Sequence, residues 1–192
     1  VGSEMCIRDS SSRYADLIEN EYNGFEIYQR TGTPLHPMSP LSKIFWMKHE
    51  QPAIYNQTAK FADIKTYIFY QLFGKYVIDY SMASATGMFN LGQLDWDEKA
   101  LKLLGISRDQ LPELVPTTHI LTGMKKRFAE LMDIDENTPV VVGASDGVLS
   151  NLGVNSYKKG EVAVTIGTSG AIRTVINKPR TCLLYTSPSP RD

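Results

Sequence analysis

The sequence predicts an α/β fold, and three observations support this prediction. Much of the chain before residue 133 consists of short segments with apolar residues at helical spacing, bounded by capping residues, prolines or glycines. The last third differs, because residues 139–142 contain three consecutive valines and end at Gly143, as a strand would. Residues 161–166 alternate like a strand and end at Gly167.

Two helices are expected near the N-terminus. Residues 11–22 have an apolar stripe at helical spacing, and Asn23-Gly24 is a typical stop signal. A shorter helix over residues 25–30 follows. The stripe of the first helix consists of Tyr14, Leu17 and Ile18.

A loop and a well-marked helix come next. Residues 31–39 (TGTPLHPMS) contain two prolines and a glycine, which exclude regular structure. Ser39 and Pro40 match an N-cap and the first helical position of a helix that runs to Glu50. Its inward-facing residues are expected to be Leu41, Ile44 and Phe45.

The rest of the chain alternates between helices and strands. Gly74 and Gly105 follow apolar segments and are typical helix stops. Ser107 and Gln110 fit a capping box that opens one more helix. A short strand is expected over residues 76–78, and further helices over residues 64–73, 97–104, 124–132 and 148–152.

The two ends of the chain look foreign to the middle. Residues 1–10 (VGSEMCIRDS) and 182–192 (CLLYTSPSPRD) carry no periodicity that continues into their neighbours, and the second combines Ser and Pro as disordered tails do. Both resemble translated linker sequence, so we expect the natural segment to be residues 11–181, cut at both ends. An ordinary frayed terminus is the alternative.

Composition excludes several classes of protein. Lys and Arg number 20 against 21 Asp and Glu, so no basic excess indicates a nucleic-acid partner. No apolar run approaches the roughly 18 residues that a membrane span needs, and no signal peptide is recognisable, so we expect a cytoplasmic protein. Cys6 and Cys182 suit neither a disulfide framework nor a zinc site, and the three histidines are far apart, so no metal-ligand set is predicted.

The turn at residues 143–147 (GASDG) permits two kinds of chemistry. It matches G-x-S-x-G, the nucleophile elbow of serine hydrolases, with Ser145 as nucleophile. That mechanism requires a histidine after the serine in the chain, and all three histidines precede Ser145, which disfavours a hydrolase. Alternatively, Asp146 takes a proton from an alcohol. For this motif taken alone, we favour a simpler role as an N-cap that accepts from the amides of Val148 or Leu149.

The second strand end, residues 165–170 (TIGTSG), is suited to binding phosphate. Its glycines let backbone N–H groups converge on an anion, and the hydroxyls of Thr168 and Ser169 add donors. A tight hairpin turn is the alternative. Together with Asp146, this turn predicts a phosphoryl-transfer site in which one strand end activates the acceptor and a neighbouring one holds the donor. The P-loop class is disfavoured because no Walker A sequence is present.

Five motifs in order give a more specific indication. Together they resemble the FGGY family of carbohydrate kinases over nearly all of residues 11–181, and residues 30–48 are most similar to gluconokinases. His49 departs from the usual pattern at the edge of the first motif. The motifs are residues 38–47 (MSPLSKIFWM), 79–84 (DYSMAS), 94–97 (LDWD), 143–147 (GASDG) and 167–170 (GTSG).

The resemblance implies an actin-like ATPase (ribonuclease H-like) fold, with two α/β domains around a cleft that binds a sugar and ATP with Mg²⁺. Residues 11–153 would be the later part of the first domain, and residues 154–181 the opening hairpin of the second. The acceptor would be a sugar or sugar acid, with gluconate favoured. The alternatives are a xylulose- or glycerol-type kinase and a noncatalytic binding lobe. Other parts of the family's site would lie outside this segment, so the segment alone is expected to be inactive.

The resemblance also assigns roles to particular residues. Asp146 would be the catalytic base, and the loop of Gly167, Thr168, Ser169 and Gly170 would contact the ATP phosphates. His36 and Met38 would lie near the sugar, although an exposed loop position is the simpler reading of His36. Two further pairs have a structural explanation at least as good as a functional one: Lys43 and Trp46 in the first motif, and Asp79 and Tyr80 as a cap and a packed ring.

Overall fold

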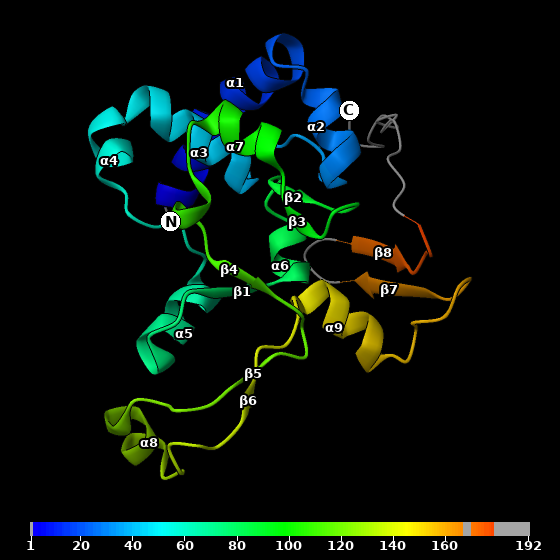
Figure 1. The fold of residues 1–192 in the computed structure, drawn as a ribbon. Coiled ribbons are helices and arrows are strands. Elements are labelled where there is room, and N and C mark those ends of the chain that lie inside the picture. The colour runs from blue at the N-terminus through cyan, green and yellow to red at the C-terminus, as the bar shows by residue number, and fades with distance from the viewer. Residues whose placement is uncertain (1, 167–169, 179–192) are drawn as a thin grey trace.

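The computed structural model describes residues 2–166 and 170–178, with side chains from residue 10 onward, and confirms a mixed α/β fold (Figure 1). None of the described helices is long and apolar enough to cross a lipid bilayer. The helices are α1 (Gly2–Glu21), α2 (Gly24–Thr31), α3 (Pro40–Glu50), α4 (Pro52–Gln57), α5 (Ile64–Phe73), α6 (Tyr80–Ser84), α7 (Glu98–Leu104), α8 (Lys126–Met132) and α9 (Asp146–Gly153).

Helices α1, α2, α3, α4 and α7 gather at one end of the molecule (Figure 1). The Ser39 side chain caps α3 by accepting from the Ser42 amide, Pro40 is the first helical residue, and the three predicted inward residues are buried. Asn23, in a left-handed conformation, separates α1 from α2, as predicted. Helix α1 begins at Gly2, earlier than predicted.

Helix α4 and the segment after Ser107 are among the elements that differ from the prediction. Helix α4 was not predicted, although Pro52 occupies its first turn. The capping box of Ser107 and Gln110 is present, but it opens only one 3₁₀ turn (Arg108–Gln110) rather than a longer helix. Leu111 ends that turn in an extended conformation, and Pro112 follows it.

The described strands form four separate pairs rather than one continuous sheet. Only β1 (Val77–Asp79) and β4 (Glu113–Val115) are parallel, with Val77 opposite Glu113. The antiparallel pairs are β2 (Phe89–Asn90) with β3 (Asp95–Trp96), β5 (Ile120–Leu121) with β6 (Val140–Val141), and β7 (Val162–Ile166) with β8 (Gly170–Thr174).

This topology corrects one expectation about the two strand ends. The run at residues 139–142 forms only the two-residue strand β6, which pairs with β5, whereas the confirmed strand β7 pairs with β8. The turns after β6 and β7 therefore do not end neighbouring strands of one sheet. Instead, the β7–β8 hairpin lies beside α9, which follows the β6 turn (Figure 1).

Two apolar clusters hold these elements. The larger joins α1, α2, α3 and α7 to β2 and β3, with Phe45 and Phe89 almost completely buried. The smaller lies between α5, β1 and α8 and includes Phe69 and Leu121.

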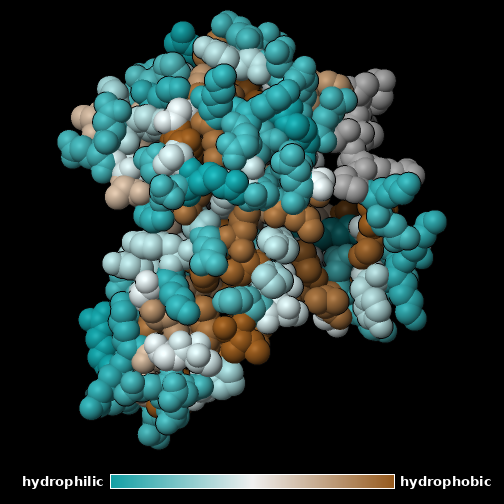
Figure 2. Space-filling model, in the orientation of Figure 1, coloured by the Kyte–Doolittle hydropathy of each residue, from teal (hydrophilic) through white to brown (hydrophobic). Residues whose placement is uncertain are grey.

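Hydrophobic residues also reach the surface in the middle of the face that Figure 2 shows, while the outer helices are largely hydrophilic there.

Candidate active site

Asp146 lies in the first turn of α9, where the chain leaves the β6 turn. Gly143 has a φ of 72°, a conformation that favours glycine, and it lets the chain turn towards the helix. Ser145 occupies the N-cap position, and its carbonyl accepts from the Leu149 amide at 3.0 Å. The N-cap role suggested for Asp146 is therefore wrong, because Asp146 is the first helical residue.

The Asp146 carboxylate is available to a ligand. The residue is exposed, and its Oδ1 accepts a hydrogen bond from the Gly147 amide at 2.6 Å. Within the described part of the chain, Oδ2 has no hydrogen-bond partner. An exposed carboxylate with one free oxygen can accept a proton from a hydroxyl group.

Hydrogen bonds from two directions hold the turn before Asp146. Lys65 Nζ donates to Asp79 Oδ2 at 2.6 Å and to the Gly143 carbonyl at 3.2 Å. The Ser145 amide donates to Ser81 Oγ at 2.8 Å, and that hydroxyl in turn donates to Asp79 Oδ1. Asp79 thus lies at the centre of the contacts that fix this turn to β1 and α6.

Asp79 is completely buried at the end of β1. Its Oδ1 accepts from the Ser81 amide at 2.9 Å and the Met82 amide at 3.2 Å, so it caps α6. Burial acts to raise the pKa of Asp79, but the hydrogen bonds from Lys65, Ser81 and Met82 outweigh it and leave the pKa below its ordinary value. Tyr80 packs against Phe89, so the structural explanation of both residues is confirmed.

A cavity of about 600 Å³ opens between α6, α9 and β8. Its volume is in the range of small-molecule sites. Asp146 lies in the sequence between Ser145 and Gly147, which both line the cavity, while its own exposed side chain is not part of the lining. The lining residues are Ser81, Ser84, Ala85, Ser145, Gly147, Val148, Asn151, Leu152, Tyr157, Ile172, Arg173, Thr174 and Val175.

Arg173 brings a positive charge to this cavity. Its Nη1 donates to Thr165 Oγ1 at 3.0 Å, and its Nε lies 3.3 Å from the point that a Cβ on Gly147 would occupy. Glycine at 147 thus leaves room for the guanidinium group beside the first turn of α9. No carboxylate among the described residues pairs with Arg173. Nothing in the sequence indicates this role for Arg173, because its approach to Gly147 depends on how the β7–β8 hairpin packs on α9.

The other predicted site residues lie in three places. Gly167, Thr168 and Ser169 lie outside the described residues, and Gly170 begins β8. His36 and Met38 are exposed on the loop before α3, where His36 Nδ1 accepts from the Met38 amide at 3.1 Å. Neither lines the cavity.

The loop of His36 and Met38 is nevertheless attached to a wall of the cavity. Thr33 Oγ1 donates to the carbonyl of Ser84, which lines the cavity, and the Leu41 amide donates to the Thr86 carbonyl at 3.0 Å. Helix α6 therefore contacts the Asp146 turn through Ser81 and this loop through Ser84.

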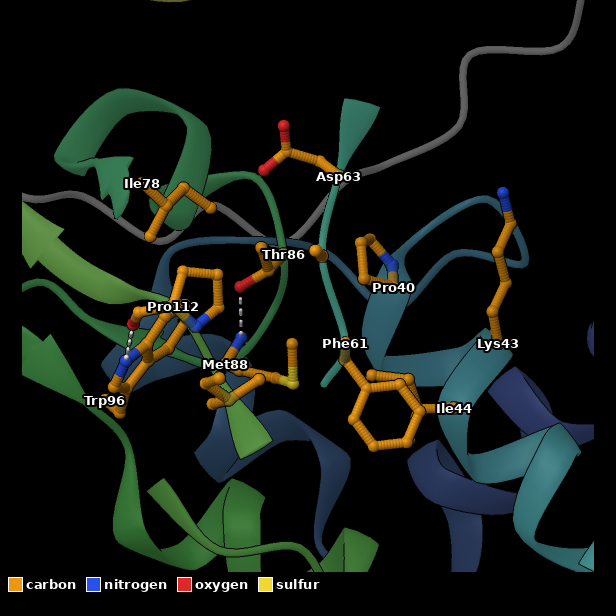
Figure 3. Close-up of a pocket in the computed structure, with 12 residues that line it drawn as sticks. Pro40, Lys43, Ile44, Phe61, Asp63, Ile78, Thr86, Met88, Trp96 and Pro112 are labelled. Carbon is orange, nitrogen blue, oxygen red and sulfur yellow. Dashed lines mark hydrogen bonds between the residues drawn. The ribbon is translucent and has the colours of Figure 1, made fainter. Parts of the chain in front are cut away.

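A second cavity, of about 210 Å³, does not suit a sugar. Figure 3 shows Ile44, Phe61 and Met88 among its mainly apolar lining. Two of the polar groups drawn there are already paired, since Trp96 Nε1 donates to the Pro112 carbonyl and the Met88 amide donates to Thr86 Oγ1. Hydroxyl groups placed against the apolar side chains there would lack hydrogen-bond partners.

The arrangement around Ser145 does not support a hydrolase. No histidine is among the residues that line the cavity beside Ser145, and His49 instead stacks on Tyr14 in the helical layer. In the first motif, Trp46 packs against the larger apolar cluster, and Lys43 lines the second cavity. Among the residues that the structure describes, no three His, Cys, Asp or Glu side chains form a group that could hold a metal ion.

Comparison with known proteins gives a consistent result. Residues 6–153 match the family model described as FGGY family of carbohydrate kinases, N-terminal domain. The chain is 61% identical over 179 residues to a gluconokinase of Bacillus subtilis, an alignment that covers 92% of this chain and 35% of the relative. It therefore spans about a third of the length of the curated relatives that it matches.

Solved structures resemble this fold closely. A gluconate kinase from Lactobacillus acidophilus superposes with a TM-score of 0.87 at 37% identity, over 90% of this chain and 35% of that one. A ligand-bound xylulose kinase from the same organism gives a TM-score of 0.86 at 37% identity, over 89% of this chain and 35% of that one.

Proposed function

The chain belongs to the FGGY family of carbohydrate kinases, and from this we propose that its parent protein transfers the γ-phosphoryl group of ATP to a hydroxyl of a sugar or sugar acid. The observation that carries the proposal is the free carboxylate of Asp146 between two residues that line a cavity of suitable size. The family match to kinases favours this function over a hydrolase or a noncatalytic lobe.

Asp146 would act as the general base. Its Oδ1 is held by the Gly147 amide, which leaves Oδ2 to accept the proton of the attacking hydroxyl. The hydroxyl oxygen forms a new bond to the γ-phosphorus as the bond from that phosphorus to the bridging oxygen breaks, and ADP leaves with that oxygen. Positioning and electrostatic stabilisation supply most of the catalysis in phosphoryl transfer, so the base needs a fixed position. The turn at residues 167–170 would bind the ATP phosphates through backbone N–H groups.

Mg²⁺ would accompany ATP in this scheme. Mg²⁺ usually binds substrate phosphates, one or two carboxylates and several waters. Because Asp146 is assigned to the acceptor hydroxyl, the carboxylates that hold the ion would come from parts of the parent outside this segment. The ion would neutralise charge on the transferred phosphoryl group. We further propose that the parent has two domains in an actin-like arrangement, with residues 11–153 in the first and residues 154–181 opening the second.

Gluconate is the acceptor that we favour. The B. subtilis relative is a gluconokinase at 61% identity. Arg173, without a carboxylate partner among the described residues, offers a charged donor for the carboxylate of a sugar acid. A ketose such as xylulose is the second candidate, because a xylulose kinase structure is as similar as the gluconate kinase structure.

An acceptor screen tests this proposal. The full-length parent protein is purified, and ADP release from ATP is measured with gluconate, xylulose, glycerol or no acceptor. We expect acceptor-dependent release that is fastest with gluconate. Faster release with xylulose would show that xylulose is the preferred acceptor and would still support a kinase. No release with any sugar or sugar acid would reject the kinase activity in favour of a noncatalytic binding lobe.

A further inference from the structure

We propose that Lys65, Asp79 and Ser81 form a bracket that positions Asp146 for catalysis. The bracket connects β1, α5 and α6 to the turn at residues 143–145, and none of its members is assigned a role in the reaction itself. The inference rests on the proposed function, because it takes Asp146 to be the base.

Asp79 organises the bracket. Its carboxylate is completely buried, yet both oxygens are satisfied, Oδ2 by the Lys65 ammonium group and Oδ1 by the backbone amide and hydroxyl of Ser81. A buried carboxylate would strongly disfavour folding if it were left unpaired, so these contacts hold Lys65 and Ser81 in fixed orientations.

Each partner of Asp79 also holds the turn, through the same atom that contacts the Asp79 carboxylate. Lys65 Nζ donates to the Gly143 carbonyl, and Ser81 Oγ accepts from the Ser145 amide. The two bonds hold the backbone on both sides of Ala144. A serine hydroxyl can donate and accept at once, which is what the Ser81 position requires.

The bracket matters because the turn has little other support next to Asp146. Strand β6 contains only two residues, and Val141 is 56% exposed. The Val142 and Gly143 amides donate to the carbonyls of His119 and Thr117, so they anchor the strand side of the turn. On the Asp146 side, among the described residues, the hydrogen bond from the Ser145 amide to Ser81 Oγ is the side-chain contact that anchors the turn.

Displacement of a catalytic group by about 1 Å can slow a reaction roughly a hundredfold even when binding persists. The bracket should therefore affect kcat more than the KM for either substrate. A purely structural role would instead lower the amount of folded protein without changing kcat per folded molecule.

Ser81→Ala and Ser81→Thr test the bracket. In the 192-residue chain, Ser81→Ala should speed amide hydrogen exchange at Ser145 by about tenfold, because the hydrogen-bond acceptor is lost. In the full-length parent, it should lower kcat by about tenfold or more and leave the KM for ATP within about twofold. Ser81→Thr retains the hydroxyl and should restore both quantities.

Two further variants complete the design. Ser107→Ala removes an exposed capping serine outside the cavity and should change neither Ser145 exchange nor kcat. Lys65→Met should lower kcat through the Gly143 side of the turn, and Lys65→Arg should recover part of the loss. If Ser81→Ala leaves kcat or Ser145 exchange unchanged in folded protein, the bracket is rejected. A wild-type parent without turnover would instead reject the proposed function, while the exchange measurement still tests the anchoring.

Discussion

Asp79 and Asp146 show how the same side chain serves two different purposes at the start of a helix. Asp79 is buried, caps α6 and is bonded through both oxygens. Asp146 stands one position beyond the N-cap of α9, where one oxygen remains available. The motif GASDG identified Asp146, but only the coordinates distinguish a capping carboxylate from a free one, because that difference depends on a one-residue shift of the helix start.

Arg173 leads to a prediction about the acceptor. In the parent, Arg173→Met should raise the KM for gluconate by about tenfold or more, because a hydrogen bond to a charged group is lost. The KM for an uncharged acceptor should change little. Arg173→Lys keeps the charge but not the bidentate geometry and should be intermediate. Steady-state kinetics with both acceptors decide the matter, and an unchanged gluconate KM would remove Arg173 from the acceptor site.

The LDWD motif shows how one residue joins several elements. Asp97 caps α7 through the Ala100 amide, and its carboxylate receives Arg30 Nε at 2.7 Å and Asn90 Nδ2 at 3.0 Å. Burial acts to raise the pKa of Asp97, but the bonds from Arg30, Ala100 and Asn90 hold it below the ordinary value. The motif therefore supports the fold rather than the chemistry.

Asp97→Asn should lower the free energy of unfolding by about 2–3 kcal/mol, because it breaks a largely buried ion pair. Asp95→Asn is the matched control in the same motif. Asp95 pairs with Arg108 at the surface, where the side chains are 43% and 47% exposed, so its loss should cost less than about 1 kcal/mol. Urea unfolding of the three proteins measures the difference, and equal effects would contradict the assigned roles.

The connection between α1 and α2 allows no side chain at Gly24. A Cβ there would lie 2.2 Å from Leu35 Cδ1 and 2.6 Å from Glu19 Cα, and the latter is backbone that cannot simply move aside. Gly24→Ala should destabilise the protein by about 1–3 kcal/mol through overpacking. Gly153 also lies in a helix but has nothing within 4 Å, so Gly153→Ala should be neutral or slightly stabilising. Thermal unfolding compares the two.

Local signals explain which elements the sequence could predict. Ser39-Pro40 and Gly74 mark helix ends by side-chain capping and by positive φ, and both predictions are confirmed. The pairing of β6 could not be predicted in the same way. Its partner, β5, lies about twenty residues earlier and has only two residues, so no local sequence pattern predicts that the two strands pair. Arg173 reaches Gly147 only through the packing of the hairpin on α9.

At the scale of the whole molecule, the two buried aspartates predict a stability that depends on pH. Folding lowers the pKa values of Asp79 and Asp97, beside Lys65 and Arg30 respectively. Each therefore stabilises the fold above its unfolded pKa, about 3.9, and this contribution is lost as the pH falls through the folded value. The melting temperature should fall steeply below about pH 4.

The pH prediction has a direct check. Asp97→Asn removes one of the two groups, so its melting temperature should start lower at pH 7 but decline less steeply in acid. A variant that shows the same acid dependence as the wild-type chain would mean that other carboxylates determine it.

The proposed function depends on Asp146 as the base of a kinase, and Asp146→Asn in the full-length parent tests this most directly. The amide cannot accept the hydroxyl proton as a carboxylate does, so kcat should fall by about 10²- to 10⁴-fold, while calorimetry should find gluconate and ATP bound with nearly unchanged affinity. Turnover close to that of the wild-type enzyme would contradict the account.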